Sequence, residues 1–313
     1  MRHFAYYVVN VVRYICPKSL YRFRTNAILS KARKSKDFDE MMDRVNYYNK
    51  IDENFSLENE GVIIKNFKFF PKTKGHSSYF FDTYEHVRFF PVTHQFSFLF
   101  GDITHVPSIP SFVKSRPVAC DNKNSVILKL NKLRHFVFIK DKIPFQKKDN
   151  KIIFYSSIVG RPHRIDFMKK YFGHPECICG DTSHHESIPK EWFVKKISLK
   201  KHLKHKFVLS LEGNDVATNL KWIMSSNCLA VMPKPKYETW FMEGRLIPDF
   251  HYVEIKDDYS DLIERMNYYI EHPDEAEKII KNANEYISKF KNKKREKIIS
   301  LMVLQKYFSK IRM

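Results

Sequence analysis

This chain has few cysteines, few glycines and no long uninterrupted apolar segment, and each of these features excludes some classes of protein. The five cysteines are an odd number without regular spacing, which excludes a disulfide framework and indicates a reducing compartment. The apolar segment at residues 4–16 is interrupted by Asn10 and Arg13 and is shorter than the about 20 residues that a membrane-spanning helix needs. No A-x-A-like cleavage site follows it, so we do not expect a secretory signal peptide. Only 8 of the 313 residues are glycine, so the position of each one is informative.

The overall composition is that of a folded protein with an anionic partner. Hydrophobic residues make up 43% of the 313 residues and aromatic residues 15%, enough for a sizeable core and too many for a disordered chain. The length favours two domains. The net charge of +20 indicates that the partner is a nucleic acid, a phosphate-bearing substrate or an acidic membrane surface.

The N-terminal segment, residues 1–36, has two interpretations. Its apolar and aromatic part, 4–16, is followed by a run of basic residues: Arg22, Arg24, Lys31, Arg33, Lys34 and Lys36. This order is typical of a helix that lies on an anionic membrane surface. It is equally compatible with a first core helix whose basic neighbour faces water.

Gly213 lies within a pattern that predicts a parallel βαβ unit. Residues 207–211 form an apolar run of strand length, and Val216, Leu220 and Ile223 then recur with helical spacing. Asn214 or Asp215 would cap that helix, and residues 228–232 form the next strand. In doubly wound sheets ligands bind beyond the carboxyl ends of the strands, where helix N-termini attract phosphate. Gly213 either lets a phosphate approach the backbone closely or only forms the turn.

The remaining elements alternate between strands and helices in both halves of the chain. We expect strands at 62–70, 97–100, 125–130, 136–139, 152–155 and 252–255, and helices at 37–50, 164–171, after Ser260, after Pro273 and at 294–311. The charged segment 141–151 is the most linker-like part of the chain. The sequence therefore predicts an α/β protein with an N-terminal domain at 1–150 and a C-terminal domain at 151–313.

Two short groupings of polar residues invite a metal assignment, and in both the simpler explanation is favoured. Asp37 and Asp39 form a D-x-D triplet, but they lie in a first helical turn, where carboxylates complement the helix dipole. A second group lacks the C-x₂-C spacing of zinc sites and comprises His174, Cys177, Cys179, His184 and His185. We therefore expect no metal and no other cofactor.

Two other groupings indicate chemistry on a substrate. Asp102 follows an apolar strand and a glycine, with Thr104 and His105 close behind, which suits a general base held by the strand and left open by the loop. An Asp that caps its own turn explains the same residues. Arg161 and Arg164 place two guanidiniums at a helix start, which suits a diphosphate and equally a solvated basic turn.

From about residue 90 to 300 the chain resembles glycosyltransferase family 90, and specifically its bacterial lipopolysaccharide-modifying branch, which is related to fungal capsule proteins and animal protein O-glucosyltransferases. The runs that carry the resemblance are Gly101–Pro110, Lys114–Pro117, Leu128–His135, Arg161–Arg164, Glu212–Trp222, Pro233–Pro248 and His251–Val253. The resemblance implies a GT-B-like fold, with two Rossmann-like domains and the donor site in the cleft between them. It also implies a UDP-sugar donor and inversion at the anomeric carbon.

The resemblance also implies roles for individual residues. The catalytic Asp falls on Asp102, and the donor diphosphate meets the turn Gly213, Asn214, Asp215, Val216, Ala217 and Thr218. Glu238 or Glu243 is the expected partner of the ribose hydroxyls, and Thr104, His105 and Arg116 lie on the acceptor side. Animal members carry Arg-Gly where this chain has Ser156-Ser157, and an Arg where Asn219 stands. Arg161, Arg164 or Lys221 is expected to supply the missing charge at the donor site.

These implications predict partners and a location. We expect a UDP-sugar, a glycolipid or lipopolysaccharide acceptor and an anionic membrane surface as partners, and no nucleic acid. The location would be the cytoplasmic face of the bacterial inner membrane, with the protein bound peripherally. The alternative that the charge alone suggests is a basic nucleic-acid-binding protein without catalysis.

Overall fold

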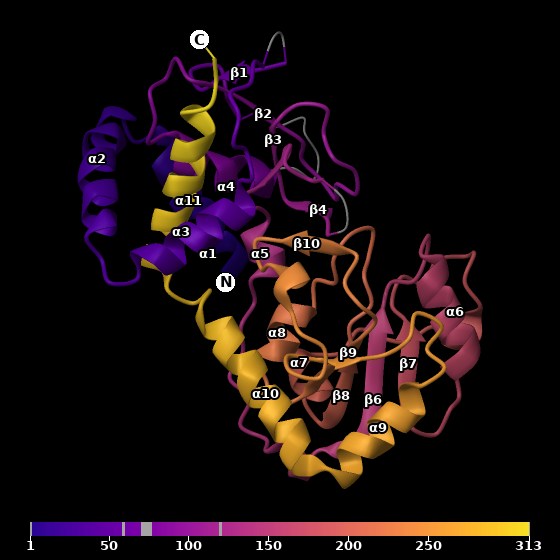
Figure 1. Cartoon of the computed structure of the whole chain (residues 1–313). Helices are drawn as coiled ribbons and strands as arrows, with labels where there is room; N and C mark the ends of the chain where they lie inside the picture. The colour runs from indigo at the N-terminus through magenta and orange to yellow at the C-terminus, as the bar shows by residue number, and fades with distance from the viewer. Residues whose placement is uncertain (1, 58–59, 70–76, 119–120, 313) are drawn as a thin grey trace. The chain divides into compact units, whose positions relative to one another are not determined.

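The computed structural model describes residues 2–57, 60–69, 77–118 and 121–312. By its contacts the chain divides into two compact units (Figure 1). Unit 1 comprises residues 1–135, 236–242 and 290–313, and unit 2 comprises 136–235 and 243–289. The units are therefore discontinuous in sequence, whereas the prediction had two continuous halves that meet at residue 150.

Unit 2 is built on a parallel sheet of five strands: β6 (Asp149–Ser156), β7 (Cys177–Asp181), β8 (His205–Leu209), β9 (Leu229–Met232) and β11 (Val253–Glu254). The strands lie in the order β11-β9-β8-β6-β7, and every neighbouring pair is parallel. The chain runs outward from β6 to β7 and then returns to the other side of β6 to form β8. This is a doubly wound sheet whose strand order reverses between β6 and β8.

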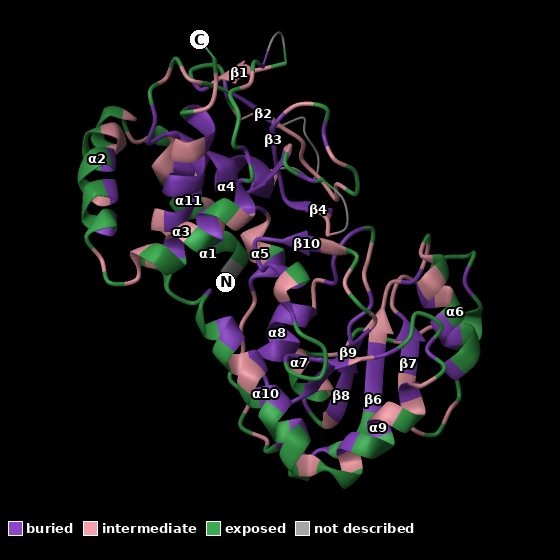
Figure 2. Cartoon of the chain, in the orientation of Figure 1, coloured by how far each residue is buried: buried purple, intermediate pink, exposed green. Residues whose placement is uncertain are grey.

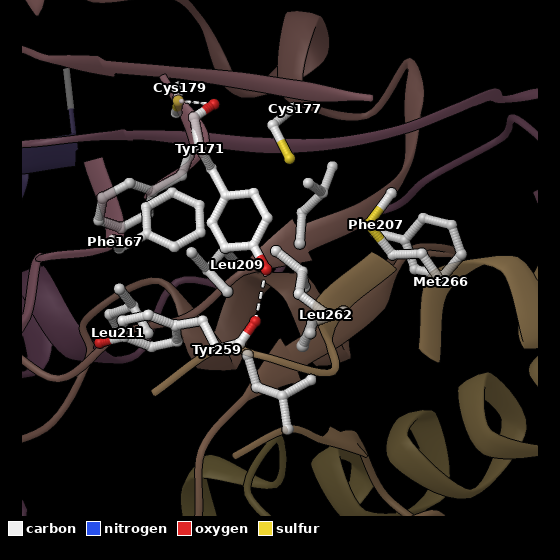
Figure 3. Packing of buried hydrophobic residues seen from close by; sticks show 14 of the residues in the cluster. Phe167, Tyr171, Cys177, Cys179, Phe207, Leu209, Leu211, Tyr259, Leu262 and Met266 are labelled. Atoms are coloured by element: carbon white, nitrogen blue, oxygen red, sulfur yellow. Dashed lines mark hydrogen bonds between the residues drawn. The ribbon is translucent and has the colours of Figure 1, made fainter. Parts of the chain in front are cut away.

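Helices cover this sheet and bury its strands. They are α6 (Pro162–Tyr171), α7 (Leu199–His202), α8 (Leu220–Met224), α9 (Leu262–Glu271) and α10 (Pro273–Ser288), with 3₁₀ turns η1 (Phe145–Lys147), η2 (Lys190–Trp192) and η3 (Glu243–Arg245). Phe207 and Leu209 of β8 and Phe167 and Tyr171 of α6 belong to one hydrophobic core, in which the Tyr171 hydroxyl donates to the carbonyl of Tyr259 (Figure 3).

The helices of unit 2 test the sequence expectations in detail. The predicted apolar stripe of α10 is confirmed, since Ala276, Ile279 and Ile287 are buried. Each buried isoleucine contributes about 1.5–3 kcal/mol relative to an exposed one. Pro273 lies in the first turn as predicted, whereas Ser260 is not the cap of α9, because its hydroxyl bonds Asp258 instead.

Unit 1 contains a four-stranded sheet in the order β1 (Val62–Ile63), β2 (Gln95–Phe98), β3 (Ser111–Val113) and β5 (Ser125–Ile127). Strand β1 is antiparallel to β2, and the other pairs are parallel. A second sheet pairs β4 (Ser115–Pro117) with β10 (Tyr237–Thr239) in antiparallel fashion. The predicted strand at 62–70 is thus only two residues long, its last position lying outside the described residues, and the predicted strand at 136–139 does not form.

The helices of unit 1 are α1 (Arg2–Ile15), α2 (Ser19–Arg33), α3 (Phe38–Tyr48), α4 (Ser77–Val87), α5 (Lys132–His135) and α11 (Lys293–Phe308). Helix α11 packs against α2, α3 and α4. Its buried Glu296 accepts a hydrogen bond from Trp240 Nε1 at 2.7 Å and pairs with Arg44 at 2.7 Å and Lys129 at 2.6 Å. These contacts explain why the C-terminal helix belongs to unit 1. Among the described residues, no helix has both the length and the apolar character needed to cross a bilayer.

Candidate active site

The candidate donor site lies where the strand order of unit 2 reverses. Because β6 and β8 are parallel neighbours, their carboxyl ends lie at the same edge of the sheet. The segment after β6 leads through Ser157 to the start of α6, and the segment after β8 contains Gly213. In doubly wound sheets the crevice between two such loops is where ligands bind.

Arg164 of α6 holds these two loops together. Its Nη1 donates to Ser156 Oγ at 2.7 Å and to the Ser157 carbonyl at 2.9 Å. Its Nη2 donates to the Leu211 carbonyl at 2.7 Å, and its Nε donates to the Glu212 carbonyl at 2.8 Å. The side chain is buried, so the guanidinium fixes the spacing of the two loops by bonding both. It also lies directly against Ser156, where animal relatives are expected to carry an arginine.

Gly213 lies beside two guanidiniums, and nothing within the chain requires a glycine there. Its backbone is not in the left-handed region. A Cβ atom at this position would lie 3.7 Å from Arg164 Nη2 and 3.8 Å from Arg161 Nε, which are ordinary contact distances. A methyl group would therefore fit in front of Gly213, in contact with both guanidiniums and with the Val216 carbonyl oxygen, which also lies 3.8 Å away.

Arg161 has donor capacity that the described residues do not use. Its Nη1 donates to the Val159 carbonyl at 2.9 Å, while its Nε is buried and has no hydrogen-bond partner among the described residues. A buried unpaired donor costs about 1–3 kcal/mol, and more where the group is charged. An anion in front of Gly213 would satisfy it.

The turn after Gly213 differs from the predicted helix start. Residues 214–219 are not helical, and α8 begins only at Leu220, so neither Asn214 nor Asp215 is its N-cap. The amide of Gly213 donates to the Asp215 carbonyl at 2.9 Å, which closes a tight turn. Of the other predicted donor residues in the turn, Asp215, Val216 and Ala217 are buried, Thr218 is half-buried, and Asn214 is exposed.

Asn219 is the second position at which the family resemblance leads us to expect an arginine. Its side chain is hydrogen-bonded to the end of β8. Its Oδ1 accepts from Ser210 Oγ at 3.0 Å, and its Nδ2 donates to the Leu209 carbonyl at 3.0 Å. This residue therefore supports the loop that carries Gly213.

Four of the predicted site residues form two buried ion pairs instead of facing solvent. Lys221 pairs with Glu243 in unit 2, and Arg116 pairs with Glu238 in unit 1 at 2.7 Å. Arg116 also donates to the carbonyl of Tyr47. These pairs are almost fully buried, so in this structure each of the four side chains is engaged with its counter-ion.

Asp102 lies in unit 1, in the loop that follows β2, whose last residue is Phe98. Gly101 has a φ of +121°, and this turn brings the carboxylate back beside Lys114. Lys114 lies between β3 and β4 and its side chain is buried, whereas that of Asp102 is 26% exposed. The hydroxyl of Ser115 donates to the Ile103 carbonyl at 3.0 Å and fixes the loop.

The contact with Lys114 was not predicted. The signal for it in the sequence is a lysine that directly follows the apolar pair Phe112 and Val113 of a strand, where a buried charge needs a partner. The ammonium is the counter-ion of the carboxylate and fixes its position. Thr104 and His105 follow on the same loop and are exposed.

The groupings that had suggested a metal are explained by other contacts. Cys177 and Cys179 lie in β7, where burial raises the pKa of their thiols to about 12 and about 11. Asp37 lies 3.4 Å from the Nε of Arg295. Among the described residues, no cluster of three His, Cys, Asp or Glu side chains could hold an ion.

Comparison with known proteins identifies the family. Residues 131–313 match the profile of glycosyl transferase family 90, and they include both loops at the reversal of strand order. The chain belongs to this family.

Similarity to individual proteins supports this assignment. This glycosyltransferase is 43% identical to O-glucosyltransferase LpsA of Dichelobacter nodosus over 266 residues, which is 85% of this chain and 82% of that protein. The chain is also 27% identical, over 116 residues, to Uncharacterized protein 179R of Invertebrate iridescent virus 6. This weaker match covers 35% of this chain and 10% of the viral protein. The protein is therefore an enzyme, and the alternative of a nucleic-acid-binding protein without catalysis is wrong. Asp102 precedes the matched residues.

Proposed function

We propose that the enzyme transfers a sugar, with inversion, from a UDP-sugar to a lipopolysaccharide or related surface glycan. The observation that carries the donor part is the position of Gly213 beside the guanidiniums of Arg161 and Arg164 at the reversal of strand order, with room for at least a methyl group between them. The name of the relative LpsA describes an O-glucosyltransferase, which supports transfer of a sugar to an acceptor oxygen, and the acceptor class is what the family resemblance implies.

The diphosphate would occupy the space in front of Gly213. There the buried Nε of Arg161 supplies a charged donor that lacks a partner among the described residues. Arg164 keeps the two loops at a fixed spacing, so the site is preorganised before the donor binds. Charge-assisted hydrogen bonds of this kind are roughly twice as strong as neutral ones. We leave Lys221, Glu238, Glu243 and Arg116 out of the proposed contacts because each is engaged in a buried pair.

Asp102 would be the general base. Its carboxylate takes the proton of the acceptor hydroxyl while the hydroxyl oxygen forms a bond to the anomeric carbon. The bond from that carbon to the phosphate oxygen breaks, and UDP leaves with the electron pair. Lys114 positions the carboxylate through their ion pair. The exposed Thr104 and His105 lie on the same loop and are the proposed acceptor contacts.

The proposal is tested by a screen of UDP-sugars for hydrolysis and for protection against thermal unfolding. With a donor identified, Asp102→Asn should lower turnover by about 10²–10⁴-fold, the usual contribution of a general base, while UDP affinity is unchanged. The matched control is Asp52→Asn, which alters an exposed carboxylate of the same unit and should keep full turnover. Full activity in Asp102→Asn would refute the catalytic assignment.

Three further expectations remain predictions. We propose that no metal takes part, so that UDP affinity would be the same in EDTA. The GT-B arrangement, with the donor in a cleft between two Rossmann-like domains, stays a prediction of the family resemblance. A peripheral position on the cytoplasmic face of the inner membrane is the third, since a lipopolysaccharide acceptor is membrane-bound while it is extended.

A further inference from the structure

Helix α1 packs on unit 1 with its polar side inward. The Tyr6 hydroxyl donates to Asp82 Oδ1 of α4 at 2.6 Å, and the Tyr7 hydroxyl lies 3.1 Å from Ser77 Oγ. One helical turn further, Asn10 is buried and Arg13 pairs with Glu85 of α4 at 2.9 Å. These positions share one face of the helix and hold it firmly on α4.

The opposite side of α1 is apolar and faces outward. Phe4 is 76% exposed and Ile15 is 75% exposed, and Val8 and Val12 lie between them on the same face. Helix α2 continues the pattern with Leu20 and with Phe23, which is 88% exposed, and most of α2 is coloured as exposed in Figure 2. A surface helix of a globular protein normally buries its apolar stripe, so the arrangement of α1 is reversed.

The charge around this surface has one sign. The first 36 residues include nine Lys and Arg and no Asp or Glu. Arg24, Lys31, Arg33, Lys34 and Lys36 are all exposed. The carboxylates nearest to α1, Asp82 and Glu85, are directed at its inner face and pair there. Exposed apolar side chains and exposed basic side chains therefore occur together on this part of the chain.

We propose that this outward side of α1 and α2, the docking face, binds the surface of an anionic lipid bilayer. A bilayer offers both an apolar interior for Phe4 and Phe23 and anionic headgroups for the basic residues. A second copy of the chain is disfavoured, because it would bring its five exposed basic residues, the same ones named above, against those of the first copy. The inference deepens the proposed function, which supplies the membrane-bound acceptor, but it can be measured without sugar transfer.

The test is co-sedimentation of the full chain with phosphatidylglycerol-containing vesicles and with vesicles of pure phosphatidylcholine. We expect binding to the anionic vesicles only, weakening as salt rises. Phe23→Ser should weaken it by at least about tenfold, because an aromatic ring no longer leaves water. Arg24→Gln should weaken it about fivefold, which corresponds to about 1 kcal/mol per charge. Controls are Phe250→Ser and Lys169→Gln, which alter exposed residues of unit 2 and should bind as the parent does.

The outcomes separate this inference from the proposed function. Phe23 is exposed, so its variant should unfold at the parent's temperature and keep its activity in UDP-sugar hydrolysis. Equal vesicle binding by Phe23→Ser and the parent would overturn the inference, as would equal binding to both vesicle types. A dimer that Phe23→Ser converts to a monomer, with vesicle binding unchanged, would assign the face to a second copy instead. Loss of vesicle binding in Phe23→Ser would support the inference even if no UDP-sugar is turned over.

Discussion

Replacing Gly213 by alanine separates a donor-site role from a structural one, because the two make opposite predictions. The added methyl would lie 3.7 Å from Arg164 Nη2 and 3.8 Å from Arg161 Nε and from the Val216 carbonyl, so the folded protein accommodates it. Since the backbone is not left-handed, the change should stabilise the fold by about 0.4–1 kcal/mol, because alanine restricts the unfolded chain.

The affinity for UDP, in contrast to the stability of the fold, should decrease in Gly213→Ala. The methyl would occupy the space in which we place the diphosphate, and would interrupt a charge-assisted contact worth about 1.5–3 kcal/mol. The expected loss of affinity is about 10- to 150-fold. Calorimetric titration with UDP and thermal unfolding of the same preparation measure both quantities. Unchanged affinity in a folded Gly213→Ala variant would refute the placement of the diphosphate.

Gly173 provides the matched control. It has a φ of +83° and follows α6, so alanine there adopts an unfavourable left-handed backbone at a cost of about 1–2 kcal/mol. The 10 residues of α6 separate it by roughly 15 Å from the start of that helix, where Arg161 and Arg164 lie. Gly173→Ala should therefore lower stability and leave UDP affinity unchanged, which is the reverse of the result for Gly213→Ala.

Two further predictions concern buried ionisable groups. Glu243→Gln leaves the buried ammonium of Lys221 without its counter-ion and should lower the free energy of unfolding by about 3–5 kcal/mol. The control Asp249→Asn breaks an exposed pair with Arg265 and should lower it by less than about 1 kcal/mol. Similar small losses in chemical denaturation would show that the Lys221 pair is not buried in solution. Burial lowers the pKa of His86 from 6.5 to about 3, so the unfolded chain binds a proton that the folded chain does not, and stability should fall as pH drops from about 6.5 towards 3. This group alone gives the free energy of unfolding a slope of about 1.4 kcal/mol per pH unit. The slope should disappear in His86→Gln and persist in a variant of the exposed His185. An unchanged slope in His86→Gln would contradict the argument.

Local patterns in the sequence were sufficient for much of the secondary structure and for the position of the carboxylate. The spacing of apolar residues predicted α10 and α11 within a few residues, and the apolar runs predicted β6, β8 and β9. The parallel βαβ unit around Gly213 and the location of Asp102 after a strand are confirmed for the same reason. Burial of one face imposes a period of two or 3.6 residues, and that period is readable without knowing the neighbours.

The partners of the polar residues were decided only by the tertiary structure. Arg116 and Glu238 are 122 residues apart and become an ion pair because β4 and β10 are neighbours, a pairing that no local pattern encodes. Arg164 holds two loops together because the strand order places β6 beside β8. The apolar and basic residues of 1–36 left two interpretations open, a helix on a membrane surface and a first core helix, because the same residues fit an apolar side that faces the solvent or the core. The orientation of α1 follows from Asp82 and Glu85 of α4, which pair with the polar side of α1 and leave its apolar side exposed.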